Sequence, residues 1–259
     1  MDRLVEKLLD LSYEWFGILM PGLIFLVFLG GSLFFSGLIT GFTSVKELEG
    51  IYQVHLKYIW FSVFFVGMVS HFGGQFLKWI SKMALDPVTA KLNEKRENWR
   101  SNVPTVLRPL TWFFGEKELV KSYTDVASMQ KAINYLKIEP SENEQQTWLK
   151  LYGIGTRLIA ISSEHSMCST YQNKYTMHRS LAIGFSFIAW LNIAIVVVCA
   201  FKSGLKFSTE CFAIVNFILF FISLIIRVIY FNSFCYFWTI LGNEVIWAIN
   251  GMFLQKELK

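Results

Sequence analysis

Charged side chains are missing from long stretches of this sequence. Residues 15–43, 58–77 and 180–201 have none, and residues 211–243 have only Arg227. Since roughly 20 mostly apolar residues cross a bilayer, these runs predict four transmembrane helices. We place the fourth at about 207–230, with the Arg227 side chain extended toward the membrane interface. Hydrophobic residues make up 54% of the chain, which is too apolar for an ordinary soluble domain.

The sequence also lacks the residue patterns of most catalytic and metal sites. Its four cysteines form no CxxC pair and show no regular spacing, which argues against a zinc site and a disulfide framework. Phosphate-binding, serine-hydrolase and zinc-protease motifs are missing as well. In the stretch from Glu164 to Cys168, His165 and Cys168 could share a helix face, but a metal site needs three or four converging ligands. We therefore predict no metal, no cofactor and no enzymatic activity.

The distribution of Lys and Arg predicts the orientation. With the N-terminus inside, all but four of the 24 Lys and Arg residues lie on the cytoplasmic side, in line with the positive-inside rule. Residues 1–14 are mixed in charge, and the apolar run after them is longer than that of a signal peptide, so we expect the first span to be retained. The sequence thus predicts a multi-pass membrane protein with both termini in the cytoplasm.

The segment between the second and third spans has helix signals of its own. An Asp-Pro pair, typical of a helix N-terminus, predicts a helix over residues 86–101, and a second helix is predicted over 116–137. Ser141 and Glu144 form a capping box. Because no proline follows this box, a single helix could run from residue 142 to residue 201.

An apolar pattern with steps of three and four residues lies on both sides of a loop predicted at 202–208. The N-terminal arm has Leu151, Ile154, Leu158, Ile161, His165, Cys168, Gln172 and Tyr175. The C-terminal arm has Phe234, Trp238, Leu241, Val245, Ile249 and Met252. We infer a helical hairpin whose inner part crosses the membrane and whose outer part is a cytoplasmic stalk. The alternative for residues 231–254 is an interfacial or re-entrant helix.

These elements predict an all-α membrane protein in three parts. Residues 1–80 hold an N-terminal amphipathic segment and the first pair of spans. Residues 81–147 form a cytoplasmic helical insert, and residues 148–259 form the long hairpin with the second pair of spans. We expect a homo-oligomer, for example a tetramer, because one copy of four helices with short loops encloses no pore.

Polar side chains inside the spans indicate what the spans do. A stripe of hydroxyl groups is formed by Ser32, Ser36 and Thr40. The stripe can line a water-filled path or hold helices together, and both interpretations stay open. Other intramembrane polar residues are His71, Asn192 and Asn216, which we expect to face away from lipid. Since no span holds a conspicuous carboxylate, a passive pore fits better than a proton-coupled transporter.

Residues 91–117 combine basic and large aromatic side chains. Three interpretations remain: the cations face anionic lipid headgroups, the aromatics form the core of a small domain, or both together hold a nucleotide or single strand. On the last interpretation, the ligand-binding residues are Lys91, Lys95, Arg96, Trp99, Arg100, Arg108 and Trp112.

The layout of the whole chain, with four spans, a basic helical insert and no catalytic signature, resembles the small bacterial membrane effectors of anti-phage defence, in particular those of the Hailong type. This resemblance implies an ion channel that depolarises the bacterial inner membrane, controlled by short single-stranded DNA from a partner nucleotidyltransferase. It rests on layout, so it assigns no residues. The alternative is a non-conducting membrane anchor that recruits a soluble partner through residues 86–140.

Overall fold

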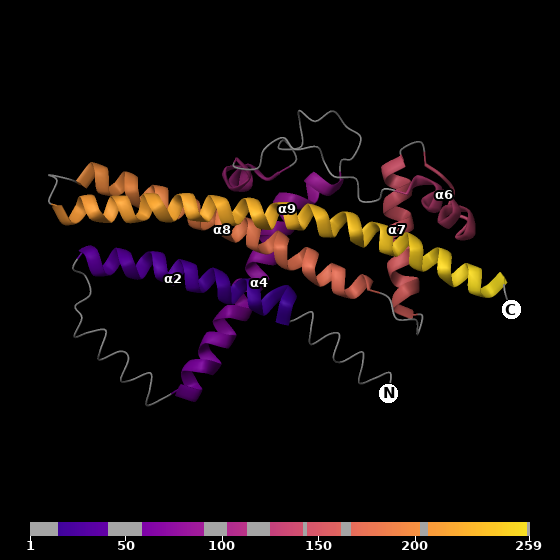
Figure 1. The fold of residues 1–259 in the computed structure, drawn as a ribbon, viewed down its shortest axis with the longest axis horizontal. Coiled ribbons are helices and arrows are strands. Elements are labelled where there is room, and N and C mark those ends of the chain that lie inside the picture. The colour runs from indigo at the N-terminus through magenta and orange to yellow at the C-terminus, as the bar shows by residue number, and fades with distance from the viewer. Residues whose placement is uncertain are drawn as a thin grey trace.

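The structure, a computed structural model, describes residues 15–40, 59–90, 103–112, 125–141, 144–161, 167–202 and 207–257. Within these ranges every regular element is helical, which confirms the all-α prediction (Figure 1). The elements are η1 (Trp15–Leu19, a π-helical turn), α2 (Met20–Thr40), α4 (Ile59–Ala90), η3 (Thr105–Leu107), α5 (Arg108–Thr111), α6 (Val126–Tyr135), α7 (Glu144–Ile161), α8 (Cys168–Lys202) and α9 (Phe207–Glu257).

The helices α8 and α9 form the predicted hairpin. They lie side by side along the longest axis of the molecule (Figure 1), and the Tyr175 ring packs on Phe234 with centroids 5.1 Å apart. The face of α9 that carries Phe234, Leu241 and Val245 is buried, because α7 and α8 cover it. Since α9 is one continuous helix through residues 231–254, that segment is the outer arm of the hairpin and not a separate interfacial helix.

The single helix proposed for residues 142–201 is wrong. The helix α7 ends at Ile161 and α8 begins at Cys168, and α7 crosses α9 instead of continuing the line of α8 (Figure 1). Crossing lets α7 bury one face, which includes Trp148 and Leu151, whereas a straight continuation would leave that face uncovered. Ile154, which the sequence pattern placed on the buried face, is instead exposed.

The helix start predicted at Asp86-Pro87 is also wrong. The helix α4 continues through both residues and ends at Ala90. Proline removes one backbone hydrogen bond from a helix, while Ala84 and Leu85, directly before it, are fully buried. This packing holds α4 helical up to the proline. Most of the helix predicted over 86–101 lies outside the described residues.

The short helix α6 corresponds to the C-terminal part of the helix predicted over 116–137. It is capped by Asp125, whose carboxylate accepts hydrogen bonds from the hydroxyl and the backbone N–H of Ser128. These hydrogen bonds, that of the hydroxyl first, lower the pKa of the Asp125 carboxyl. The helix is fixed to the outer arm of the hairpin, because Asn250 Nδ2 donates to the Ser128 carbonyl oxygen at 3.0 Å and Tyr135 stacks on Phe253.

The described parts of the insert share one core with the hairpin. This core joins Leu85 of α4, Val103, Ile133 of α6 and Trp148 of α7 to the buried faces of α8 and α9. Residues 103–112 and 125–141 therefore pack directly on the hairpin. A movement in this part of the insert would act on α8 and α9 without passing through a flexible linker.

Alanine substitutions at two glycines of α7 are expected to have opposite effects on stability. A Cβ atom on Gly155 would lie 2.6 Å from Ile249 Cδ1 and 2.9 Å from Val245 Cγ1, whereas a Cβ atom on Gly153 would meet nothing within 4 Å. We expect Gly155→Ala to lower the free energy of unfolding by about 1–3 kcal/mol. Gly153→Ala should raise it by up to about 1 kcal/mol through helix propensity. Thermal unfolding of both variants in detergent, followed by circular dichroism, measures the difference. Equal melting temperatures would contradict the α7–α9 contact.

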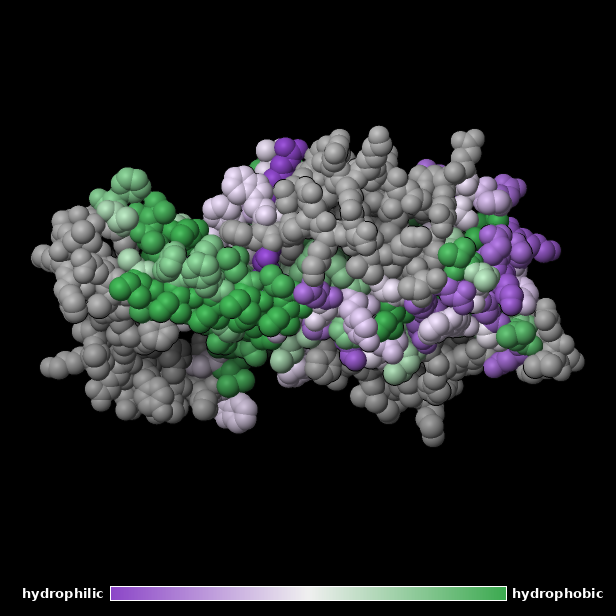
Figure 2. All heavy atoms as spheres, turned by 45° about the horizontal axis from the view of Figure 1, so that its top comes forward, coloured by the Kyte–Doolittle hydropathy of each residue, from purple (hydrophilic) through white to green (hydrophobic). Residues whose placement is uncertain are grey.

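In the described part of the chain, two helices are long and apolar enough to cross a membrane, over Cys168–Val198 in α8 and Ala213–Gln255 in α9. A shorter apolar helix covers Gly17–Ser32. Only 22% of the α9 window is buried, unlike the core helix of a soluble protein. Apolar residues gather at the end of the molecule where α8 and α9 meet, and hydrophilic ones at the opposite end (Figure 2).

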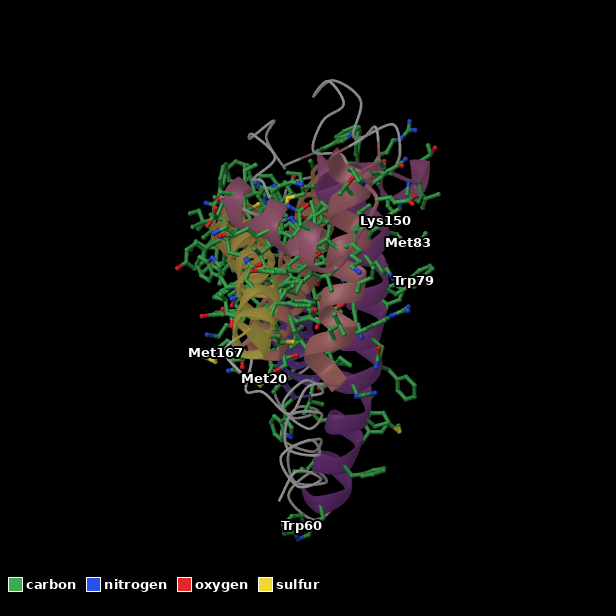
Figure 3. The ribbon with its side chains drawn as sticks, turned by 90° about the vertical axis from the view of Figure 1, so that its right-hand side faces the viewer. Met20, Trp60, Trp79, Met83, Lys150 and Met167 are labelled. Carbon is green, nitrogen blue, oxygen red and sulfur yellow. The ribbon has the colours of Figure 1, made fainter. Side chains whose placement is uncertain are left out.

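The helix α4, which holds the second predicted span, crosses the hairpin instead of lying along it (Figure 1). Trp60 lies at its far end, and Trp79 projects outward from the same helix (Figure 3). Both indoles are exposed. Where α4 meets the N-terminal end of α2, Gly22 and Gly74 bring the two backbones into direct contact.

Candidate functional site: a buried polar seam

The outer surface of the hairpin tip is apolar. The exposed side chains on α9 are Ile214, Phe217, Ile218, Phe221, Ile222, Ile225, Val228 and Ile229, and those on α8 include Val197, Val198 and Phe201. Soluble monomers rarely expose a continuous apolar surface of this kind. At 1.5 Å per residue, the band between Ile214 and Ile229 is roughly 23 Å long, which covers about three quarters of a hydrocarbon core of about 30 Å.

The inner face of α9 at the same level is polar. Asn216, Ser223 and Arg227 are separated by seven and four residues, so they lie on one helix face. Phe234 continues that face seven residues later. All three polar side chains are buried, with exposed fractions of 0%, 2% and 6%. The apolar contact face of the outer arm therefore becomes polar toward the hairpin tip.

Asn192 on α8 lies opposite this polar face. The side chain is fully buried, and its Nδ2 donates to the Ile188 carbonyl oxygen at 2.9 Å. The hairpin register, in which Tyr175 packs on Phe234, continues toward the tip and brings Asn216 to the level of Asn192. The Asn192 Oδ1 atom has no hydrogen-bond partner among the described residues.

Ser32 reaches the same level from α2. This helix runs alongside α8 in the same direction (Figure 1), with Phe28 packed on Phe185 at 4.9 Å between ring centroids. Ser32 lies one turn beyond Phe28, and Asn192 lies one turn beyond Ile188 of the same packed cluster. Ser32 is buried. We call Ser32, Asn192, Asn216, Ser223 and Arg227 the polar seam.

Aromatic and cationic side chains lie at the inner end of the polar seam. The Arg179 guanidinium is buried; it lies 5.0 Å from the centroid of the Tyr175 ring, and its Nη1 donates to the Tyr175 hydroxyl at 3.1 Å. His178 stacks on Phe237 at 5.1 Å between centroids, and Lys174 Nζ lies 5.3 Å from the same ring. Cations over ring faces are stabilised by the ring quadrupole. Positive charge is therefore concentrated at this end.

The insert touches α8 close to the polar seam. The Trp190 indole Nε1 donates to the Pro109 carbonyl oxygen at 2.8 Å, and Trp112 packs edge-on against Trp190 with centroids 5.7 Å apart. Leu110 and Thr111, which lie between Pro109 and Trp112 in the chain, are buried. Residues 103–112 therefore pack directly on α8. Trp190 is two residues from Asn192, so this contact lies close to the α8 member of the polar seam.

The structure places only part of the predicted ligand-binding set. Arg108 is half-buried, and its Nε donates to the Val103 carbonyl oxygen at 3.3 Å. Trp112 is 62% exposed. The other five residues, Lys91, Lys95, Arg96, Trp99 and Arg100, lie outside the described residues. The structure therefore shows two members of the set, four residues apart, at the contact between the insert and α8.

The polar residues of the spans partly follow the predictions. Asn192 and Asn216 are buried inside the helix packing, whereas His71 is partly exposed on α4. Burial of Ser32 inside the subunit favours the interpretation of the hydroxyl stripe as a helix contact. The side chains of Ser36 and Thr40, further along α2, lie outside the described part of the structure, so their role in a path stays a prediction.

The Arg227 side chain does not extend outward as predicted. It is buried, because this face of α9 packs against the neighbouring helices. The sequence signal was the spacing of Arg227 from Phe234, which extends the apolar pattern of the outer arm. Ser223, four residues earlier, follows from the same spacing and was missed.

The close approach of α2 and α4 at Gly22 and Gly74 was also missed. The signal for the observed contact was the Gly73-Gly74 pair in an apolar run, which lets another backbone approach closely.

No protein-family model matches the sequence, and no curated protein or solved structure is significantly similar to it. Over the residues that the structure describes, the fold is all-helical, with two helices long and apolar enough to cross a membrane. Near the tip of the hairpin the outer surface is apolar, and the buried face of α9 carries polar side chains.

Proposed function

We propose that this chain is a membrane effector that conducts ions through a bundle of its helices, under the control of an anionic ligand. The observation that carries the proposal is the polar seam, which buries polar and charged side chains inside a hairpin whose outer surface is apolar. Buried polar groups in spanning helices are costly and typically mark a pathway or a binding site. The described side chains leave the seam closed, so conduction requires the helices to move apart.

Control by a ligand is proposed from the contact between the insert and α8. Trp112 offers an exposed ring for base stacking, and Arg108 offers a guanidinium suited to phosphate. Both lie in the segment that Trp190 holds through Pro109. A ligand that binds this segment differently in two packings of the hairpin would shift the balance between them.

The wider role follows the resemblance to Hailong-type effectors. On this proposal, the protein is a homo-oligomer in the bacterial inner membrane, with four spans per subunit and cytoplasmic termini. A partner nucleotidyltransferase supplies a short single-stranded DNA, and opening depolarises the membrane in anti-phage defence. Lys91, Lys95, Arg96, Trp99 and Arg100 would extend the ligand surface.

Ion flux from liposomes tests this proposal. Purified protein is reconstituted, and the release of trapped salt is measured with and without short oligonucleotides. We expect flux that the oligonucleotide changes. Trp112→Ala should remove most of this response because it removes the stacking ring, worth about 1–3 kcal/mol per base. Trp79→Ala is the matched control, since it deletes an indole of similar exposure on α4.

The outcomes separate the hypotheses. Flux that oligonucleotides leave unchanged keeps the channel and removes the proposed ligand. A response that survives Trp112→Ala moves the ligand away from residues 103–112. No flux from protein shown to be folded would contradict conduction and favour the membrane anchor.

A further inference from the structure

We infer that the path through the hairpin selects anions, with Arg227 as the residue that sets this selectivity. The inference rests on the proposed function, because it names the class of ion that the path conducts. Its basis is the sign of the charge buried along the polar seam and the absence of opposing charge in the sequence around it.

The sequence around the polar seam contains one charge sign only, and the nearest acid toward the C-terminus in α9 is Glu244. The sequence has no Asp or Glu from Trp15 to Thr40, from Ile59 to Leu85, or from Cys168 to Lys202. In α9 it has none between Cys211 and Asn243. Arg227 is the cation within that last range, and the structure buries it inside the bundle.

The position of Arg227 on α9 lets its charge act on an ion that passes along the polar seam. Arg227 lies on the same face of α9 as Asn216 and Ser223, so an ion that passes along this face meets the guanidinium after the two neutral polar groups. A guanidinium stays protonated in proteins and presents five N–H donors, which bind anions and bind no cation. In a region of low dielectric such a charge attracts anions and repels cations far more strongly than in water.

The neutral members of the seam do not reverse this preference. Asn192 directs its Nδ2 to the Ile188 carbonyl oxygen and leaves the Oδ1 atom as a weak acceptor. Arg179 adds a second buried cation at the inner end. Rings of Arg or Lys side chains are a known basis of anion selectivity in pores.

The reversal potential in a potassium chloride gradient tests the inference. Purified protein is incorporated into a planar bilayer with unequal salt on the two sides. We expect the reversal potential of the wild type to have the sign of the chloride equilibrium potential. Arg227→Gln should lower the permeability ratio of chloride to potassium about tenfold, the scale on which focused charge concentrates ions. Arg227→Lys should keep most of that ratio because it keeps the positive charge.

Arg157→Gln is the matched control. It removes one positive charge from an exposed position on α7, so it changes the net charge of the chain equally and should leave the ratio unchanged. Circular dichroism and gel filtration show whether each variant folds. If Arg227→Gln fails to fold, the wild type and Arg227→Lys still decide the sign of the selectivity.

The outcomes distinguish this inference from the proposed function. A wild type that prefers potassium overturns anion selectivity and keeps the channel. A chloride preference that Arg227→Gln leaves intact overturns the role of Arg227. A folded wild type that conducts nothing overturns the proposed function and this inference with it.

Discussion

Replacing Gly74 with alanine is expected to separate α2 from α4. A Cβ atom at this position would overlap the carbonyl oxygen of Ile18, and one at Gly22 would overlap the carbonyl oxygen of Ser70. Both obstacles are backbone atoms of a packed helix, so no side chain can rotate to make room. We expect Gly74→Ala to lower the free energy of unfolding by about 3 kcal/mol or more, the upper end of overpacking costs.

Gly67→Ala on the same helix provides the control. A Cβ atom there would meet nothing within 4 Å, so this substitution should leave stability unchanged or raise it by up to about 1 kcal/mol through helix propensity. Thermal unfolding in detergent compares the two. The α2–α4 contact would be wrong if both variants melted at the same temperature.

The second large effect is expected at Phe234. This ring is 1% exposed and packs on Tyr175 and Phe231, where α9 changes from its polar to its apolar face. Phe234→Ala leaves a cavity that the helices on both sides cannot fill, at a cost of about 3–5 kcal/mol. Loss of this contact should also loosen the hairpin, because the ring fixes the register of α8 against α9.

Tyr236→Ala is the matched substitution for Phe234→Ala. Tyr236 lies two residues along α9 with its ring exposed, so its removal should change stability by less than about 0.5 kcal/mol. Chemical unfolding curves followed by tryptophan fluorescence give both values. Similar curves for the two variants would show that Phe234 does not anchor the hairpin.

The hairpin could be predicted because its signal is local and repeated. Phe234, Leu241, Val245 and Ile249 mark one face over several turns, and a face of this kind must be covered. The break between α7 and α8 could not be predicted in the same way, since no proline or strong turn signal falls between Ile161 and Cys168. It is decided by the packing of α7 across α9, a contact between residues far apart in the chain.

Part of the candidate site could also be predicted. Asn192 and Asn216 are polar groups in apolar runs, and the cost of exposing them to lipid predicts their burial. The burial of Arg227 was not predicted, because a charge near the end of a 20-residue apolar run usually extends toward the membrane interface. The contact of Trp190 with Pro109 depends on tertiary packing and has no sequence signal.

The unbroken course of α9 has a mechanical consequence. Its 51 residues make a helix roughly 77 Å long. Near its C-terminal end α9 is fixed to α6, because Asn250 donates a hydrogen bond to the Ser128 carbonyl oxygen. A continuous helix passes a rotation along its length, because hydrogen bonds couple each turn to the next. A rotation that α6 imposes at this contact therefore turns Asn216, Ser223 and Arg227 in the same direction, because all three lie on one face of α9.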